Sequence, residues 1–213
     1  MSDVNGNGER DQRRDGRLEL LSAIVLGIAA LLTALAAWQA GERDGQALEN
    51  YSDANRQLND ANAFYAQGNQ TAATDQGLFV QYAVAATEGN TDVADYLRTS
   101  LMRPELREAV DWWENDEDAV TPFDEDEDNP YAIADWAEAN ALEEQSALTF
   151  DEGLAADEQG GVFEITNIFF AGSLFFAGIG SVFRRYDIRL YVIGVAVLAL
   201  LTGIVGLVMA FRG

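Results

Sequence analysis

Three long runs of apolar residues constrain the fold of this chain more than any other feature. Residues 20–38 and 190–211 carry no charge, and residues 163–183 carry one, Glu164. About 20 helical residues rising 1.5 Å each cross roughly 30 Å of hydrocarbon. A soluble helix of this length would keep a polar face, which the second and third runs lack. The sequence therefore predicts an all-α integral membrane protein with transmembrane helices at residues 19–40, 163–183 and 190–211.

Arginine placement predicts the direction in which the chain crosses the membrane. Arginines precede the first run and lie between the second and third: Arg10, Arg13, Arg14, Arg17, Arg184, Arg185 and Arg189. Basic residues in short segments beside transmembrane helices favour the cytoplasmic side. We therefore expect a multi-pass protein of the plasma membrane, with a cytoplasmic tail at 1–18 and a cytoplasmic turn at 184–189. Residues 41–162, with 5 arginines and 29 acidic residues, would form an extracytoplasmic domain.

The first apolar run has a second interpretation. A basic leader, an apolar stretch and the small residues around Ala34 and Ala36 also resemble a secretory signal peptide with its cleavage site. A signal core usually has ~7–15 apolar residues, fewer than this run. The sequence favours a retained helix and leaves cleavage open.

Composition excludes several classes of function. The chain has no cysteine and no histidine, so disulfides, Cys/His zinc sites and histidine-based catalysis are excluded. The net charge of −23 argues against a nucleic-acid partner. All 13 basic residues are arginine, and the acidic excess is typical of a salt-loving or high-GC prokaryote, in which an acidic surface preserves solubility. We expect a non-enzymatic protein with no cofactor.

Residues 41–162 are predicted to be helical, because no alternating strand pattern occurs there. A heptad seam is formed by Ala47, Tyr51, Ala54, Leu58, Ala61 and Tyr65. The same phase extends back through Ala40, Ala37, Thr33, Ala30 and Leu26. The first span should therefore continue as one helix to about Gly68. We expect the seam to pack inside the chain's own helical bundle, and a seam between chains is the alternative.

Further helices are predicted at residues 72–87, from about Thr91, and from Pro104 to about Trp113. An acidic loop should follow, because a run of like charges repels itself. Asn129-Pro130 suits the start of the next helix, which Gly160-Gly161 would join to the second span.

The acidic loop holds the candidate metal site. Asp124, Asp126, Asp128 and Asp135 occupy positions 1, 3, 5 and 12 of a calcium-loop count. Asn129 stands where such loops place glycine, and Asp135 is shorter than the usual bidentate glutamate. The alternative interpretation is a solvated linker that binds Ca²⁺ or another hard cation only diffusely.

The spans hold few polar groups. Glu164 and Asn167 lie near the outer end of the second span, where interfacial solvation explains them as well as function does. Glycine, alanine and serine recur in the spans at spacings that favour close helix contacts. Trp112, Trp113 and Trp136 are expected to be core or interface anchors.

The segment Ile168-Phe169-Phe170-Ala171-Gly172-Ser173-Leu174-Phe175-Phe176-Ala177-Gly178-Ile179, followed by Arg184-Arg185, resembles a family of three-span prokaryotic membrane proteins. The alanine- and tyrosine-rich stretch at 51–65 is similar to that family too. The resemblance implies one N-terminal span, a helical outer domain and a C-terminal pair of spans. It implies no activity and no site residues.

These observations favour a membrane protein whose outer helical domain mediates self-association or binds a partner at the cell surface. We expect contact with membrane lipid, and either a homo-oligomer or a membrane or surface protein as partner. The first alternative is a subunit of an oligomeric cation channel or transporter, in which the acidic domain concentrates cations at a pore mouth. The second is a calcium-responsive membrane sensor built on the acidic loop.

Overall fold

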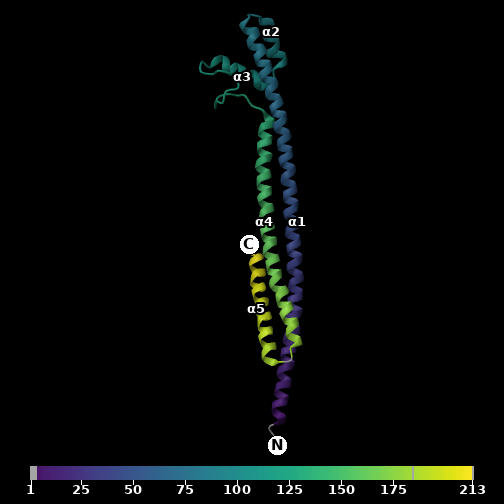
Figure 1. Cartoon of the computed structure of the whole chain (residues 1–213). Helices are drawn as coiled ribbons and strands as arrows, with labels where there is room; N and C mark the ends of the chain where they lie inside the picture. The colour runs from purple at the N-terminus through teal and green to yellow at the C-terminus, as the bar shows by residue number, and fades with distance from the viewer. Residues whose placement is uncertain (1–3, 184, 213) are drawn as a thin grey trace. The chain divides into compact units, whose positions relative to one another are not determined.

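The computed structural model describes residues 4–183 and 185–212, with side chains from residue 16 onward. These residues contain no strand, which confirms the all-α prediction. The elements in chain order are α1 (Val4–Thr87), α2 (Thr91–Tyr96), the single π-helical turn η1 (Leu97–Leu101), α3 (Pro104–Asn115), α4 (Ala134–Val182) and α5 (Tyr186–Ala210) (Figure 1). The side chains of Arg10, Arg13 and Arg14, and all of Arg184, lie outside the described part.

Three helices in the described residues are long and apolar enough to cross a membrane, as the sequence predicts. They are the part of α1 from Gly16 onward, α4 and α5. The chain divides into two compact units, one of residues 1–52 and 150–213, here called the membrane unit. The other, residues 53–149, is called the acidic unit.

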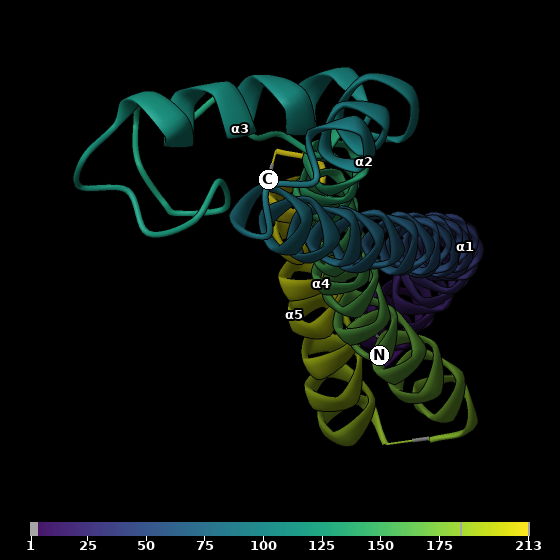
Figure 2. The ribbon, with the colours of Figure 1, turned by 90° about the horizontal axis from the view of Figure 1, so that it is seen from above.

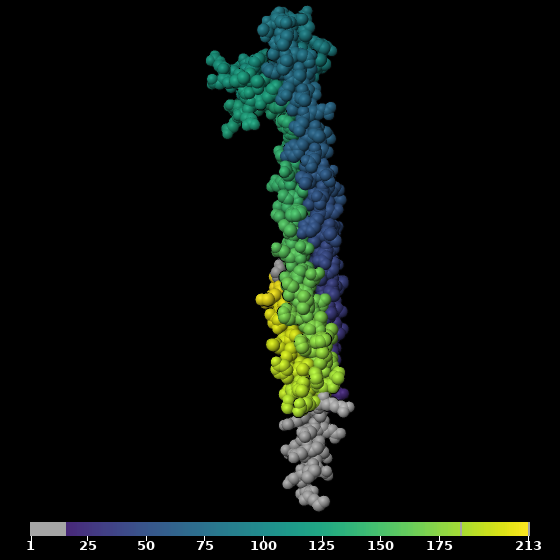
Figure 3. Space-filling model, in the orientation of Figure 1, coloured from purple at the N-terminus to yellow at the C-terminus, as the bar shows by residue number. Residues whose placement is uncertain are grey.

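The membrane unit packs its three helices through small residues. Parts of α1 and α4 lie beside α5 around a shared apolar core (Figure 2), formed by Val25, Ala29, Ala36, Phe163, Phe170, Ala177, Ala196, Leu200 and Leu207. In the space-filling view, atoms of α4 and α5 meet along the membrane unit (Figure 3). The Phe170 ring lies directly against Gly203, so a larger residue at 203 would collide with it. The small residues therefore allow the close approach that the sequence predicts.

A polar contact joins two of these spans as well. Ser22 Oγ of α1 donates a hydrogen bond of 2.9 Å to the Ala177 carbonyl of α4. Serine hydroxyls commonly form such bonds between helices inside a membrane, where water cannot satisfy them.

The seam predicted inside the first span is shifted by one residue at two positions, whereas its member Ala40 is buried as predicted. Ala29 and Ala36 are buried, whereas the predicted Ala30 and Ala37 are exposed. An α-helix has 3.6 residues per turn, so a strict seven-residue pattern drifts about 20° per heptad across the helix surface. The span also packs in one core with two helices, which moves its buried face away from the seam.

Beyond the span, α1 packs against α4 within the same chain, as the first interpretation of the seam predicts. In the membrane unit, the Tyr51 ring lies against Gly153 and stacks at 5.1 Å from the Phe150 ring. In the acidic unit, Ala54 and Ala61 are buried, and Ser146 Oγ donates a 2.8 Å hydrogen bond to the Ala54 carbonyl. Small side chains on both helices make this close contact possible.

The prediction is wrong for one member of the seam, Leu58. Leu58 is 41% exposed, and the neighbouring Gln57 is half-buried in its place. Ala54 and Ala61, seven residues apart, both lie on the face of α1 that contacts α4. Between them, either Gln57 or Leu58 can turn towards that face, because the two residues lie at its opposite edges. Tyr51 and Tyr65 are half-buried, in agreement with the prediction.

The acidic unit has its own core, where the end of α1 meets α2, η1, α3 and the loop after α3. Its buried members are Tyr82, Ala85, Ala94, Leu97, Met102, Leu106 and Val110. Phe79 packs edge-to-face on Trp113 and on Phe123, with ring centroids 5.1 and 5.7 Å apart. This aromatic cluster attaches the loop to the helices, because rings in such geometry attract each other beyond simple area burial.

The predicted break between residues 68 and 72 is absent, and α1 continues to Thr87. Gly68 serves packing instead: the Trp136 indole occupies the space that a Cβ at residue 68 would need. The helix ends where Gly89 adopts a positive φ of 76°, a conformation that favours glycine. Asn90 then caps α2 through a hydrogen bond from the Val93 amide.

The predicted start of α4 is also wrong. The helix begins at Ala134, after Asn129-Pro130, and continues through Gly160-Gly161 into the span. Asn129 instead holds the loop together, since its amide donates to the carbonyls of Pro122 and Asp124 at 3.1 and 2.7 Å. Its Oδ1 accepts a hydrogen bond from the Tyr131 amide. An asparagine side chain that bonds nearby backbone competes with helix initiation in this way.

Candidate functional site

The four aspartates of the predicted calcium site lie in different settings. Asp124 is engaged inside its own turn, where its carboxylate accepts hydrogen bonds from the amides of Val120 and Thr121 and from Thr121 Oγ1. These bonds lower the pKa of Asp124, with the Thr121 hydroxyl as the largest cause. Asp126 accepts a hydrogen bond from the amide of Asp128.

Asp135 stands apart from the loop in the first turn of α4. Among the described residues, no three acidic side chains gather closely enough to hold a metal ion. The structure therefore does not bring the four aspartates together as one ligand set. Calcium binding stays a prediction.

The best-formed polar site of the acidic unit is centred on Asp75 of α1. Its side chain is 4% exposed. The Asp75 carboxylate forms an ion pair with Arg103 and accepts a hydrogen bond of 2.7 Å from Arg103 Nε. Tyr131 Oη donates to the same carboxylate oxygen at 3.0 Å. The Arg103 guanidinium also lies over the Tyr131 ring, 5.2 Å from its centroid, and pairs with Glu105 at 3.0 Å. We call Asp75, Arg103 and Tyr131 the Asp75 triad.

Burial sets the electrostatics of the Asp75 triad. It raises the pKa of Tyr131 to about 12, and the nearby negative charge of Asp75 adds to the increase. Burial is the largest single influence on the pKa of Arg103 and would lower it, but the hydrogen bonds and charge interactions with Asp75 and Tyr131 together outweigh burial, so the pKa is raised. Arg103 thus stays charged and Tyr131 stays neutral at physiological pH. The triad joins α1 to the start of α3 and to the loop.

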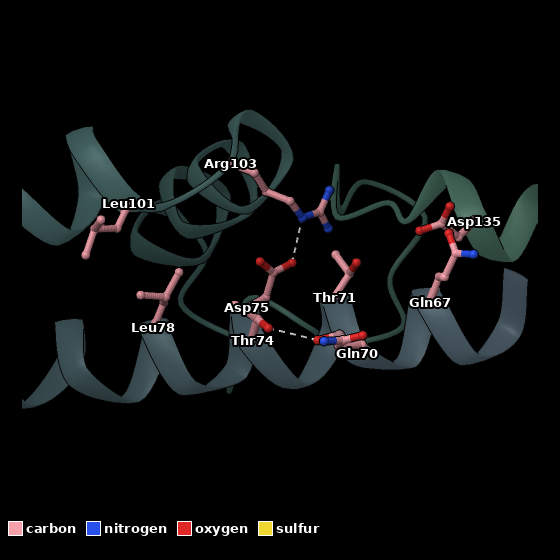
Figure 4. Close-up of a pocket in the computed structure, with 9 residues that line it drawn as sticks. All are labelled: Gln67, Gln70, Thr71, Thr74, Asp75, Leu78, Leu101, Arg103 and Asp135. Carbon is pink, nitrogen blue, oxygen red and sulfur yellow. Dashed lines mark hydrogen bonds and ion pairs between the residues drawn. The ribbon is translucent and has the colours of Figure 1, made fainter. Parts of the chain in front are cut away.

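A cavity of about 460 Å³ opens beside the Asp75 triad (Figure 4). One wall comes from α1, which contributes Gln67, Thr71 and Thr74, and Asp135 lies beside Gln67 at one end of the cavity. Arg103 Nη2 is buried there and has no hydrogen-bond partner in the described structure. The lining can offer amide and hydroxyl groups to a small polar molecule, while the Asp75 carboxylate is committed to Arg103 and Tyr131.

A second arginine network lies closer to the end of α1. Arg98 of η1 pairs with Glu114 at 3.0 Å, pairs also with Asp111, and donates to Tyr82 Oη at 3.1 Å. Tyr82 in turn donates to the Glu114 carboxylate. Burial and this hydrogen bond raise the pKa of Tyr82. Together the two networks fix η1 and α3 onto α1 through charge-assisted hydrogen bonds, which are the stronger kind.

Sequence reasoning did not identify either network. The available signal was that Asp75 is the only charged residue between Asp60 and Glu88, and the structure buries it. The unit contains only four arginines against 22 acidic residues, so each arginine has many candidate partners for an ion pair. Spacing alone could not choose a partner, because the contacts join residues 16 to 56 positions apart.

Two of the three tryptophans predicted as anchors, Trp113 and Trp136, pack against other elements. Trp113 packs on Phe79 and donates from Nε1 to the Val120 carbonyl at 3.1 Å. Trp136 covers Gly68 and donates to Asn69 at 3.3 Å, while Trp112 is half-buried.

The polar groups of the second span behave differently from one another. Glu164 is exposed on α4, whereas Asn167 is half-buried. Asn167 Oδ1 and the fully buried Ser173 Oγ have no hydrogen-bond partner in the described structure. A buried polar atom without a partner costs free energy, so these two atoms are the polar features of the span that most require an explanation.

Comparisons of the chain with models of known protein families, with curated proteins and with solved structures found no match. The three apolar helices implied by the family resemblance are present in the described residues.

Proposed function

We propose that this chain is a non-enzymatic membrane protein whose acidic unit lies outside the cell and mediates association, either with itself or with a partner. The arginines that flank the spans support this orientation, because basic residues favour the cytoplasmic side. The family resemblance is compatible with the same arrangement.

The observation that carries the proposal is the way the acidic unit uses its polar groups. The Asp75 triad and the Arg98 network join helix to helix and helix to loop. Such contacts give the unit a fixed outline, which favours recognition of another protein because rigid surfaces lose less entropy on binding.

The test is association between copies in a membrane. The chain has no cysteine, so Ala147→Cys, an exposed position on α4, provides a single labelling site. Donor- and acceptor-labelled full-length chains are reconstituted together in vesicles at a low protein-to-lipid ratio. We expect energy transfer above that of randomly distributed labels, or capture of a surface protein partner. Random transfer together with no captured partner would refute the proposal.

A subunit of an oligomeric cation channel is the second candidate. The half-buried Asn167 favours it, because water or a neighbouring chain could contact its amide group in a pore. Liposomes containing the full-length chain would then pass monovalent cations, and Asn167→Leu would reduce the flux. If the flux equals that of empty liposomes, the channel hypothesis fails and the association hypothesis is unaffected.

A further inference from the structure

The second half of α1 presents an exposed face that carries no charge, within a unit that is otherwise strongly acidic. Between Asp60 and Glu88 the helix has one charged residue, Asp75, and that residue is buried against Arg103. The acidic unit as a whole has 22 acidic residues and four arginines. Absence of exposed charge over 27 consecutive residues is therefore a marked departure from the rest of the unit.

This exposed face has the spacing of a helix-packing surface. Its members recur at three- and four-residue intervals and are all exposed: Asn62, Ala66, Asn69, Ala73, Gly77, Val80 and Val84. We call them the neutral face. Val80 and Val84 are 59% and 52% exposed, so apolar surface at this end remains open to solvent. The helix buries a different set of residues in its own unit, among them Ala61, Gly68 and Tyr82.

We propose that a second copy of this chain covers the neutral face, with the two α1 helices packed against each other about a two-fold axis. The proposal rests on the proposed function and names the surface through which copies associate. Two acidic units repel each other wherever their carboxylates meet, and the neutral face is where they can approach without that cost. A basic partner would instead be drawn to the acidic surfaces.

The residues of the neutral face suit a self-complementary contact. A two-fold interface places the same surface on both copies, so each part of the face meets itself. Ala66, Ala73 and Gly77 are small enough for two helices to approach closely, and Val80 and Val84 supply apolar area at one end. Copies inserted in one membrane point in the same direction across it. Their α1 helices are then parallel, as the proposed two-fold packing requires.

The size of the face determines where association should be seen. Residues 62–84 extend about 33 Å along the helix, and a contact strip roughly 10 Å wide covers on the order of 330 Å² per copy. A stable interface in solution buries about 800 Å² per partner, so this contact alone is weak. Anchoring both copies in one membrane raises their effective concentration and compensates for the small area. The experiment therefore uses the full-length chain in vesicles.

Single cysteines test the surface directly, because the chain has none of its own. Ala73→Cys and Val80→Cys place a thiol on the neutral face, and Ala147→Cys places one on an exposed position of α4 as the matched control. A disulfide needs Cβ atoms about 4 Å apart, so oxidation should link copies through residues 73 and 80 far faster than through 147. Equal rates at the three positions would overturn the proposal.

A charge substitution gives a second measurement. Val80→Glu puts two carboxylates face to face, and we expect at least about a tenfold loss of association by energy transfer, which corresponds to about 1.4 kcal/mol. Ala141→Glu adds the same charge at an exposed position of α4 and should leave association unchanged. If both variants associate as well as the parent chain, the neutral face is the wrong surface while association itself stands. If the parent chain shows no association, the self-association form of the proposed function fails with it, and binding of a different partner is the form that remains.

Discussion

Removing the Asp75 carboxylate should destabilise the acidic unit strongly. Asp75→Ala leaves Arg103 Nε and Tyr131 Oη without their shared acceptor, at a site where the Asp75 side chain is 4% exposed. Loss of one partner of a buried ion pair costs about 3–5 kcal/mol. Arg103 is 23% exposed and keeps Glu105 as a second partner, which places the ion-pair loss near the lower limit, about 3 kcal/mol. The orphaned tyrosine hydroxyl adds about 1 kcal/mol.

The assay is urea unfolding of the full-length chain in detergent, followed by tryptophan fluorescence. Trp113 reports on the correct region because it packs on Phe79, one helical turn from Asp75. We expect a loss of about 4 kcal/mol for Asp75→Ala and about 2 kcal/mol for Asp75→Asn, which keeps an acceptor for Tyr131. The double variant Asp75→Leu with Arg103→Met should unfold within about 2 kcal/mol of the parent, because no unpaired charge remains.

The double variant is also the control for the reasoning. A coupling free energy between residues 75 and 103 follows from the cycle of Asp75→Leu alone, Arg103→Met alone and the double variant. A loss below about 1 kcal/mol for Asp75→Ala, or additive losses in the double variant, would refute the claim that this ion pair holds the unit together.

Four further predictions concern a helix contact, a buried tyrosine and the acidic loop. Gly153→Val should destabilise the packing of α1 on α4 by about 1–3 kcal/mol, because its side chain collides with the Tyr51 ring; Gly161→Val, where a Cβ meets nothing within 4 Å, is the thermal-unfolding control. The pKa of Tyr131 is raised from 10.0 to about 12, so its neutral form contributes stability that is complete below pH 10 and is lost as the pH rises towards 12. Tyr131→Phe should reduce the fall in the free energy of unfolding between about pH 9 and about pH 11.5, measured by urea titration at each pH. The same fall as in the parent chain would contradict the assignment. Asp124→Ala removes the acceptor of the Val120 and Thr121 amides and should speed proteolysis of the loop, whereas exposed Glu125→Ala should not. If calcium, but not magnesium, raises the melting temperature and Asp124→Asn with Asp128→Asn abolishes the shift, the calcium-sensor alternative gains support.

Local pattern was sufficient to predict the spans and most helices. Apolar runs of about 20 residues have few alternatives to a transmembrane helix, and Pro104 begins α3 where the sequence predicts. Helix boundaries were less predictable where a residue has two uses. Gly68 can end a helix or make room for Trp136, and only the packing partner decides between them.

The candidate site shows the same division. Spacing along the loop suggested a cation site at Asp124, Asp126 and Asp128, because charge and interval are visible in a sequence. Whether a carboxylate is free or already bonded depends on nearby backbone amides, as at Asp124. The Asp75 triad joins α1, the start of α3 and the loop, so it could not be derived from any one segment.

The central claim is that the acidic unit stands outside a membrane that the chain crosses three times. Ala147→Cys in the acidic unit and Asp187→Cys at the start of α5 are each exposed and provide single thiols for a membrane-impermeant maleimide. In intact cells we predict labelling of residue 147 and none of residue 187, with residue 187 labelled only after the membrane is opened. Labelling of 187 without 147 would invert the topology, and equal labelling of both in intact cells would contradict a membrane crossing between them.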